Sequence, residues 1–393
     1  MIKFAMKHLA IRTGKNILIA LSVIITLTVS LLAYNIANQV KDGIVNSYKY
    51  YDTIIGPAGS QTQLVLNTLS YTDKPLGLIP YDTYENLLVD TRVAVIIPFA
   101  EGDNYNNSRI IGTDAKYLDE FKIVHGEAFS AKYEAVIGYN VYKDKNLRVG
   151  DTFYSVHGLT TDVNSHSHTD ENEQYTIVGI LGKTNTATDN VIFTNIESVW
   201  ATHGNENDNA GEDDHNEQEI TAALIKCTNF SAQASLSDEY NQMSGMQAIN
   251  PSAVMRELMN NVDLSRNIVY VLCAIILVMN LFIIYVITMV NMYDIKKDII
   301  LLRLIGVAKA RIEAIVYIQS LVISVVSVII GFLISRVLML IIGGITQNMG
   351  IVLNTSKFYN FELLIITLII VMIFLPIIIS VKRIFMERIV NEN

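Results

Sequence analysis

The sequence predicts a membrane protein with four transmembrane α-helices and one large α+β extracytoplasmic domain between helices 1 and 2. Four stretches contain no Asp, Glu, Lys or Arg: residues 16–40, 267–293, 314–335 and 363–381. A helix crosses a bilayer core with about 20 apolar residues, and these stretches contain 25, 27, 22 and 19 residues. The composition agrees, because 51% of the 393 residues are hydrophobic and only 17% are charged.

The charges are divided unevenly along the chain, which predicts the topology. Residues 41–266 carry 32 acids and 15 bases, whereas the rest of the chain carries 6 acids and 14 bases. Loops rich in Lys and Arg stay in the cytoplasm. We therefore expect both termini and the loop between the second and third spans to be cytoplasmic, and residues 41–266 to lie outside.

These observations define the expected order of segments. The first span reads as a retained helix rather than a signal peptide, because its apolar run from Ile17 to Tyr34 is longer than a secretory h-region of about 7 to 15 residues. The segments are an amphipathic cytoplasmic start (1–15), helix 1 (16–40), the extracytoplasmic domain (41–266), helix 2 (267–293), a cytoplasmic coupling helix or loop (294–313), helix 3 (314–343), a short outer loop (344–361), helix 4 (362–381) and a cytoplasmic tail (382–393).

Residues 41–266 alternate between strand-like and helix-like patterns, which predicts an α+β domain. A β-prone run from residue 51 ends at Gly56 and Pro57, and the run 63–69 reads as a helix or a second strand. Further strands are expected at 93–98, 175–181, 191–194 and 221–227, and helices at 231–243 and 252–259.

A hydrophilic insert, residues 154–219, interrupts this pattern and contains five of the seven histidines among many acids. Imidazole and carboxylate groups are common ligands of zinc and other divalent ions, so a metal site is one interpretation. The other is a solvated loop with incidental histidines, because the spacing fits no closed tetrahedral motif. The candidate ligands are His157, His166, His168, His203 and His215.

Searches for catalytic motifs are negative, which predicts a non-catalytic chain. Gly182-Lys183-Thr184 resembles the end of a phosphate-binding loop, but that motif needs a glycine where Ile177 stands. Neither a zinc-protease helix nor a nucleophile elbow is present.

The loop between spans two and three contains an amphipathic segment. Its apolar residues at 295, 299, 302 and 305 fall on one helical stripe, and Gly306 is expected to end the helix. One interpretation is a helix on the membrane surface. The other is a docking element for a soluble cytoplasmic partner.

The run Asp298-Ile299-x-x-Leu302-Arg303-x-x-Gly306 resembles the signature of the FtsX-like permeases, the MacB and LolC/LolE class of ABC transporter subunits. The order of one span, a large domain and three further spans agrees with that family over the whole chain. The runs 175–181 and 190–194 are also similar to strands of the periplasmic core domain of MacB-like proteins.

The resemblance implies a bacterial inner-membrane permease that works with other proteins. Its expected partners are a cytoplasmic ABC ATPase dimer that binds ATP and Mg²⁺, a second permease copy or paralogue, membrane lipids, and optionally a membrane-fusion adaptor or lipoprotein, but no nucleic acid. Force from the ATPase would move the outer domain if the 294–312 helix were rigidly continuous with span three. The residues expected to couple to the ATPase are Lys296, Lys297, Asp298, Leu302, Arg303 and Gly306.

Two functions follow from this resemblance. The first is export or extraction of a substrate at the outer face of the membrane by mechanotransmission. The alternative is a signalling or regulatory membrane protein of the FtsX type, which senses a ligand or activates an extracytoplasmic enzyme. The chain itself is expected to bind no cofactor, apart from a zinc or other divalent ion at the histidines.

Arg336 lies at the end of an apolar run in the third span. A charged side chain at mid-bilayer costs about 2.5–3.5 kcal/mol on insertion scales. We therefore expect Arg336 to face a dimer seam or to extend its head group toward the outer interface.

Overall fold

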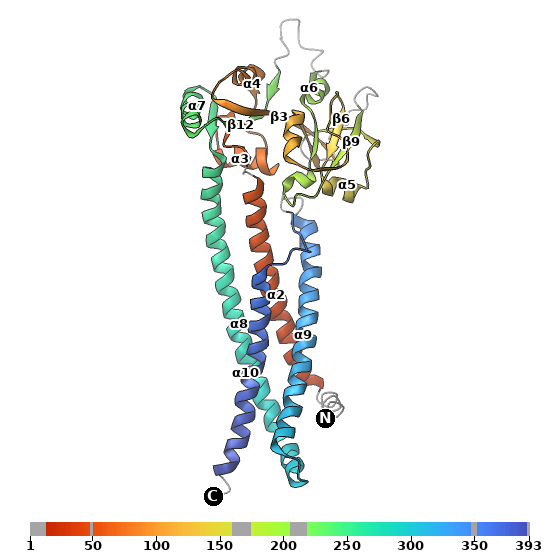
Figure 1. Ribbon diagram of the computed structural model, residues 1–393, viewed down its shortest axis with the longest axis vertical. Coiled ribbons are helices and arrows are strands. Elements are labelled where there is room, and N and C mark those ends of the chain that lie inside the picture. Colours follow the sequence, from red (N-terminus) through yellow and green to blue (C-terminus); the bar gives the residue numbers. More distant parts are fainter. Residues whose placement is uncertain (1–12, 48–49, 159–173, 205–217, 347–351, 391–393) are drawn as a thin grey trace. The chain divides into compact units, whose positions relative to one another are not determined.

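The computed structural model describes residues 13–47, 50–158, 174–204, 218–346 and 352–390 (Figure 1). Its contacts divide the chain into two units. The membrane unit contains Met1–Asn38, Asp263–Ile342 and Thr355–Asn393, and the α+β unit contains Gln39–Val262 and Gly343–Asn354.

The membrane unit is built from four long helices, which Figure 1 shows running alongside one another. They are α2 (Thr13–Ser47), α8 (Pro251–Leu304), α9 (Lys309–Thr346) and α10 (Asn360–Val390). Each contains a segment long and apolar enough to cross a membrane: Thr13–Gly43, Arg266–Val290, Lys309–Thr346 and Asn360–Ile379. The predicted fold class, four spans with an α+β domain between the first and second, is confirmed.

The interior of this bundle is apolar and is shared by all four helices. Leu27 of α2, Ile284 of α8, Val316 of α9 and Ile369 of α10 belong to one buried cluster. Large apolar side chains also cover much of the outer surface of the helices, as expected where lipid rather than water surrounds them.

Helices α2 and α9 approach closely where a glycine removes bulk. A Cβ atom on Gly331 would lie 3.2 Å from the carbonyl oxygen of Ile24 and from the side chain of Leu27. The hydroxyl of Thr28 donates a 3.1 Å hydrogen bond to the Gly331 carbonyl across the same contact. Small residues at helix contacts in membranes allow this kind of backbone approach.

The α+β unit is built on a mixed sheet, which in the described residues has eleven strands, nine of them along one main path. The main path runs β13-β1-β12-β3-β4-β10-β6-β9-β5, with β7 beside β9 and β8 beside β3. Most pairs are antiparallel, but β10–β4 and β6–β9 are parallel. The strands are β1 (Thr53–Pro57), β3 (Val93–Tyr105), β4 (Ser108–Thr113), β5 (Ile123–Gly126), β6 (Glu134–Ile137), β7 (Thr152–Phe153), β8 (Val156–His157), β9 (Tyr175–Leu181), β10 (Ile192–Asn195), β12 (Ala222–Cys227) and β13 (Met246–Ile249).

Helices and one small strand pair complete the unit. The strands β2 (Ile79–Pro80) and β11 (Glu219–Ile220) form the pair. The helices are α3 (Gln61–Ser70), α4 (Tyr81–Leu88), α5 (Tyr139–Lys145), α6 (Ile196–Gly204) and α7 (Phe230–Gln242), with 3₁₀ turns η1 (Ala115–Glu120) and η3 (Ala187–Asn190).

Both faces of the central strands are buried. In β1, Ile54 belongs to a cluster that includes side chains of α3, and its neighbour Ile55 belongs to a second cluster that includes side chains of α4, α6 and α7. In β12, Leu224 and Ile225 divide between the same two clusters. The central strands therefore read in the sequence as continuous apolar runs rather than as alternating ones.

The local sequence sets where the helices begin. The Ser60 hydroxyl accepts from the Gln63 amide at the start of α3, and the Asn229 side chain accepts from the Ala232 amide at the start of α7. The Asn250 side chain does the same for the Ala253 amide at the start of α8. Such caps satisfy amides that have no partner in the first turn of a helix.

Candidate functional site

The expected coupling segment forms a sharp turn between α8 and α9. We call residues 299–312 the elbow. Helix α8 continues without interruption from Pro251 through the second span to Leu304, and α9 begins at Lys309. The amphipathic segment is therefore the last part of the second-span helix. Its expected rigid continuity with the third span is wrong, because the chain leaves the helical conformation at Gly306.

Gly306 ends α8 by a defined mechanism. Its φ angle is +84°, in the left-handed region that glycine adopts without steric cost. The amide of Val307 donates a 3.0 Å hydrogen bond back to the Leu302 carbonyl, and the Ile305 amide donates to Leu301 at 3.2 Å. A backbone bond from the residue after the glycine to the carbonyl five positions earlier defines a Schellman cap.

A small apolar cluster fixes the elbow from inside. Ile299 of α8 and Ile312 of α9 are buried, and Leu302 and Val307 pack against them. Leu302 and Val307 occupy the two positions whose apolar side chains accompany this type of cap. Ile305, in contrast, is 77% exposed, so only part of the predicted apolar stripe faces inward.

The structure places the predicted coupling residues unequally. Leu302 and Gly306 both stabilise the elbow, Leu302 by packing and Gly306 by its backbone conformation. Lys296, Lys297, Asp298 and Arg303 lie on the backbone of α8, but their side chains are outside the described residues. Beyond the elbow, Lys309 and Glu313 form an ion pair of 3.7 Å on the first turn of α9.

Arg336 has a partner within the chain that the sequence analysis did not name. Its guanidinium lies 2.5 Å from the carboxylate of Glu362, the third residue of α10. It also donates to the carbonyls of Thr355 and Lys357, at 3.3 and 3.0 Å, and packs over the Phe332 ring. The head group lies at the connection between α9 and α10. Its position at a dimer seam or at the outer interface of the membrane stays a prediction.

Glu362 is fully buried and is held on both sides. One carboxylate oxygen meets Arg336, and the other accepts the Tyr359 amide at 3.1 Å. The sequence contained one signal for this pair, since Glu362 directly precedes the charge-free stretch 363–381 and Arg336 directly follows another. Two opposite charges at the ends of apolar runs are candidates for pairing.

The histidines are only partly described. His157 lies on β8 opposite Asp103 of β3, with 3.7 Å between its Nδ1 and the carboxylate. His203 lies on α6, but its side chain is outside the described residues, as are His166, His168 and His215 entirely. Among the described residues, no group of three or more His, Cys, Asp or Glu side chains could hold a metal ion. The metal site stays a prediction.

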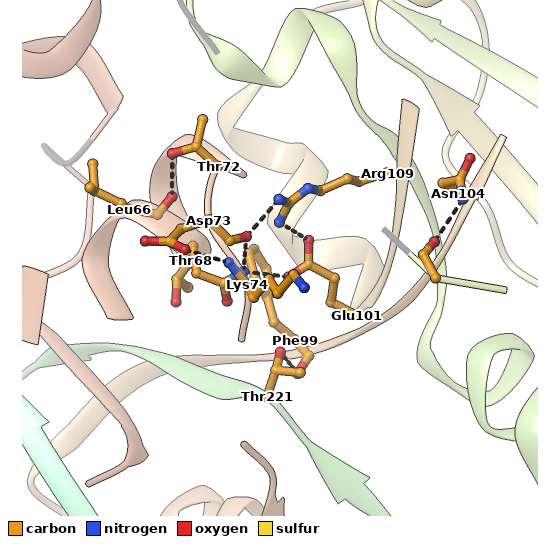
Figure 2. A network of polar contacts seen from close by, with 12 residues as sticks. Leu66, Thr68, Thr72, Asp73, Lys74, Phe99, Glu101, Asn104, Arg109 and Thr221 are labelled. Atoms are coloured by element: carbon orange, nitrogen blue, oxygen red, sulfur yellow. Dashed lines mark hydrogen bonds and ion pairs between the residues drawn. The ribbon is translucent and has the colours of Figure 1, made fainter. Parts of the chain in front are cut away.

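A buried polar network stabilises the α+β unit (Figure 2). Glu101 of β3 and Arg109 of β4 form an ion pair of 2.6 Å, and Glu101 also accepts from the Asn67 amide of α3 at 2.6 Å. Arg109 in turn donates to the Asp73 carbonyl at 2.6 Å. Burial raises the pKa of Glu101, and the nearby Arg109 charge opposes that rise. The network ties α3 and the loop after it to the β3–β4 hairpin.

Two comparisons with known proteins return similar sequences or structures. Residues 270–387 match the family described as FtsX-like permease C-terminal. Among solved structures, the chain resembles the extracellular domain of the noncanonical ABC-type transporter YknZ from Gram-positive bacteria, with 12% identity and a TM-score of 0.32 over 51% of this chain and 100% of that one. No curated protein matches significantly. The region from α8 through the elbow to the last turns of α10 thus matches the FtsX-like permease C-terminal family, within a chain that has four candidate membrane spans.

Proposed function

We propose that this chain is the membrane subunit of an ABC transporter that drives movements of its α+β domain with ATP hydrolysed by a separate cytoplasmic ATPase dimer. The movement would export or extract a substrate at the outer face of the membrane. The chain would act with a second permease copy or a paralogue, and an adaptor or lipoprotein could join outside. The observation that carries the proposal is the elbow, a rigid turn inside the family-matched region.

The elbow has the properties that a force-receiving element needs. Its turn is fixed by the Gly306 cap and by the cluster around Ile299 and Ile312, so a push on it would move both helices rather than deform the loop. On its surface, Leu304 and Ile305 are 74% and 77% exposed. Adjacent exposed apolar side chains of this kind are suited to an interface with a partner.

A route for the movement is present in the backbone. Helix α8 has 54 residues and no break, which at about 1.5 Å per residue gives a length of about 80 Å. Only Asn250 separates its first residue from β13, and β13 pairs with β1 in the sheet. Movement of the first turns of α8 would therefore be passed to the sheet through a strand.

The direct experiment is coexpression with candidate ATPases. Ile305→Asp should reduce recovery of the ATPase with the permease at least tenfold, because it places a charge on the exposed elbow surface. Phe230→Asp is the matched control, since Phe230 is also exposed, at 81%, but lies on α7 of the α+β unit. Equal recovery with both variants would contradict the proposal.

Gly306→Pro tests the geometry rather than the surface, because proline cannot adopt a positive φ angle. ATP turnover of the assembled complex should lose its dependence on the permease. Reconstituted transport then separates the two functions: a complex that hydrolyses ATP in response to the permease but moves no substrate would favour the signalling alternative.

The orientation is proposed from the charge distribution and is tested separately. In a Cys227→Ser, Cys273→Ser background, a cysteine in place of Lys297 should react with a membrane-impermeant thiol reagent only from the cytoplasm. A cysteine in place of Lys132, which is exposed on the α+β unit, should react only from outside. The reverse pattern would overturn the topology.

The predicted metal site has its own test. Zinc titrated into the full chain should release heat that is lost when His166 and His168 are both replaced by alanine. No heat above buffer in the unsubstituted chain would leave the insert as a solvated loop.

A further inference from the structure

The α+β unit contains a pocket of about 450 Å³ that has no role in the coupling described above. Its wall comes from the residues just before β1, the end of α3, the 3₁₀ turn η1 and the residues after it, the start of β5, and the loop that leads from β9 into η3. Pockets of about 300–1,000 Å³ are typical of small-molecule sites.

One wall is a cluster of aromatic rings. Tyr51 and Tyr117 stack with ring centroids 6.3 Å apart, and Phe121 meets Tyr117 edge to face at 5.3 Å and Tyr50 at 6.4 Å. Burial raises the pKa of Tyr51 and of Tyr117, so both phenols stay neutral near pH 7. Tyr51 and Tyr117 are buried, so the ring surface open to a flat ligand belongs to the half-buried Tyr50 and Phe121.

The wall is held in place from behind. The residue after Tyr51 is Asp52, whose carboxylate accepts the Cys227 amide at 3.0 and 3.1 Å and whose amide donates to Ile225 at 3.0 Å. The Tyr117 hydroxyl is paired with that of Tyr71. A ligand would find these groups already ordered, which lowers the entropic cost of binding.

The opposite wall, residues 182–188, is fixed by one buried carboxylate. Asp189 accepts the backbone amides of Thr184 and Asn185 and the Thr184 hydroxyl, each at 2.8 Å. Thr186 bonds back to the Thr184 hydroxyl at 2.7 Å. These hydroxyls are thus engaged within the loop, and the recognition of a charged ligand falls to other groups.

Those groups are charged side chains at the rim. Lys122 and Lys183 line the pocket and are exposed, and a 2.7 Å bond from the Gly182 amide to the Lys122 carbonyl holds their backbones side by side. Glu120 is the one acid in the lining, so the rim carries a net positive charge. The Lys183 ammonium lies 5.9 Å from the centroid of the Tyr139 ring. A negative group on a ligand would attract the ammonium groups of both lysines.

We propose that this pocket binds small molecules that carry an aromatic ring and an anionic group, with the ring against Phe121 and Tyr50 and the anion at Lys122 and Lys183. The binding needs no ATPase, so it is independent of the coupling proposed above. Failure of one proposal leaves the other standing, because their readouts differ.

The test uses two probes that share a ring and differ in charge, naphthalene-1-sulfonate and 1-naphthylmethylammonium. Each is titrated by calorimetry into the full chain in lipid nanodiscs, with empty nanodiscs as the reference. The sulfonate should bind at least tenfold more tightly than the ammonium compound. Lys122→Glu combined with Lys183→Glu should abolish this preference, whereas Lys143→Glu combined with Lys226→Glu, a control of equal charge elsewhere in the unit, should keep it.

Two single variants test binding in the pocket without relying on the double lysine substitution. Glu120→Gln should tighten sulfonate binding about threefold, because it removes the like charge from the rim. Phe121→Ala should weaken both probes about fivefold, because both use the ring. Equal binding of the two probes, no heat from either, or an unchanged preference in the double lysine variant would each overturn the proposal.

Discussion

The ion pair between Arg336 and Glu362 should make a large contribution to the stability of the membrane unit. Removal of one member of a buried pair leaves the other charge uncompensated and costs about 3–5 kcal/mol. In Glu362→Gln, Arg336 keeps its bonds to the carbonyls of Thr355 and Lys357, so the lower end, about 3 kcal/mol, is expected. At roughly 2–4 °C per kcal/mol, the melting temperature should fall by about 6–12 °C.

Arg336→Met should cost a similar amount, because Glu362 is fully buried and would keep only the Tyr359 amide. The double variant Arg336→Met with Glu362→Gln should cost no more than either single change, since it leaves no buried charge without a partner. This non-additivity is the specific mark of a paired interaction.

The assay can follow the membrane unit alone. Cys273 lies on α8 within the second span, and in a Cys227→Ser background its reaction with a thiol-reactive dye on heating reports unfolding of the helices. The exposed pair of Lys309 and Glu313 supplies the control, because Glu313→Gln should cost less than about 0.5 kcal/mol. Melting within 1 °C of the parent for both single variants at Arg336 and Glu362, or strictly additive losses in the double, would refute the reasoning.

Three further predictions concern other positions. Gly306→Ala should lower the melting temperature of the membrane unit by a few degrees, because alanine at φ +84° costs about 1 kcal/mol; an unchanged dye-reaction curve would contradict the cap. Glu101→Gln should destabilise the α+β unit by about 3 kcal/mol, because Arg109 would lose its buried partner. Urea unfolding followed by Trp200 fluorescence measures this, and a change below about 1 kcal/mol would exclude a stabilising role for the ion pair. Hydrogen bonds from the backbone amides of Ser130 and Ala131 lower the pKa of Glu134. The stability that Glu134 adds to the α+β unit is therefore present above the ordinary carboxyl pKa range and is lost as pH falls through the lowered pKa. Glu134→Gln should weaken the unit at pH 7 but not at acid pH, and a difference that persisted in acid would rule out this cause.

The sequence predicted the elements whose pattern is local. Four charge-free runs became the four long helices, and apolar runs such as 175–181 and 221–227 became β9 and β12 almost without change. These predictions succeeded because apolar groups, of lipid for the long helices and of protein for the strands, surround both kinds of element, so that composition alone distinguishes them from loops. The run 63–69, which was open between helix and strand, is helix α3, which Ser60 caps.

Other elements depended on partners far away in the chain. The strand expected to end at Pro98 continues to Tyr105, because the residues beyond the proline pair with β4. Strands of two residues, such as β7 and β8, have no periodicity to detect and exist only through their pairing with β9 and β3. Burial by the fold, not local propensity, decides these cases.

The candidate sites divide in the same way. Gly306 was recognisable as a helix end because glycine after an amphipathic run is a local signal. The pairing of Glu362 with Arg336 was not predicted, because it depends on where two helices meet. The sequence pattern also did not show whether the coupling segment continues the second-span helix or the third-span helix. Both flanking segments are apolar, and only the backbone conformation shows which helix includes the coupling residues.

The uninterrupted course of α8 restricts how the length of the chain can vary. Each residue inserted between Pro251 and Leu304 turns everything after it by about 100° and displaces it by about 1.5 Å. Within the membrane unit, a single insertion between Ile284, which belongs to the buried cluster of the four helices, and Ile299 would rotate the elbow relative to the bundle. Seven residues restore the phase to within about 20°. Length changes in this segment should therefore be accepted in multiples of two helical turns and rejected otherwise.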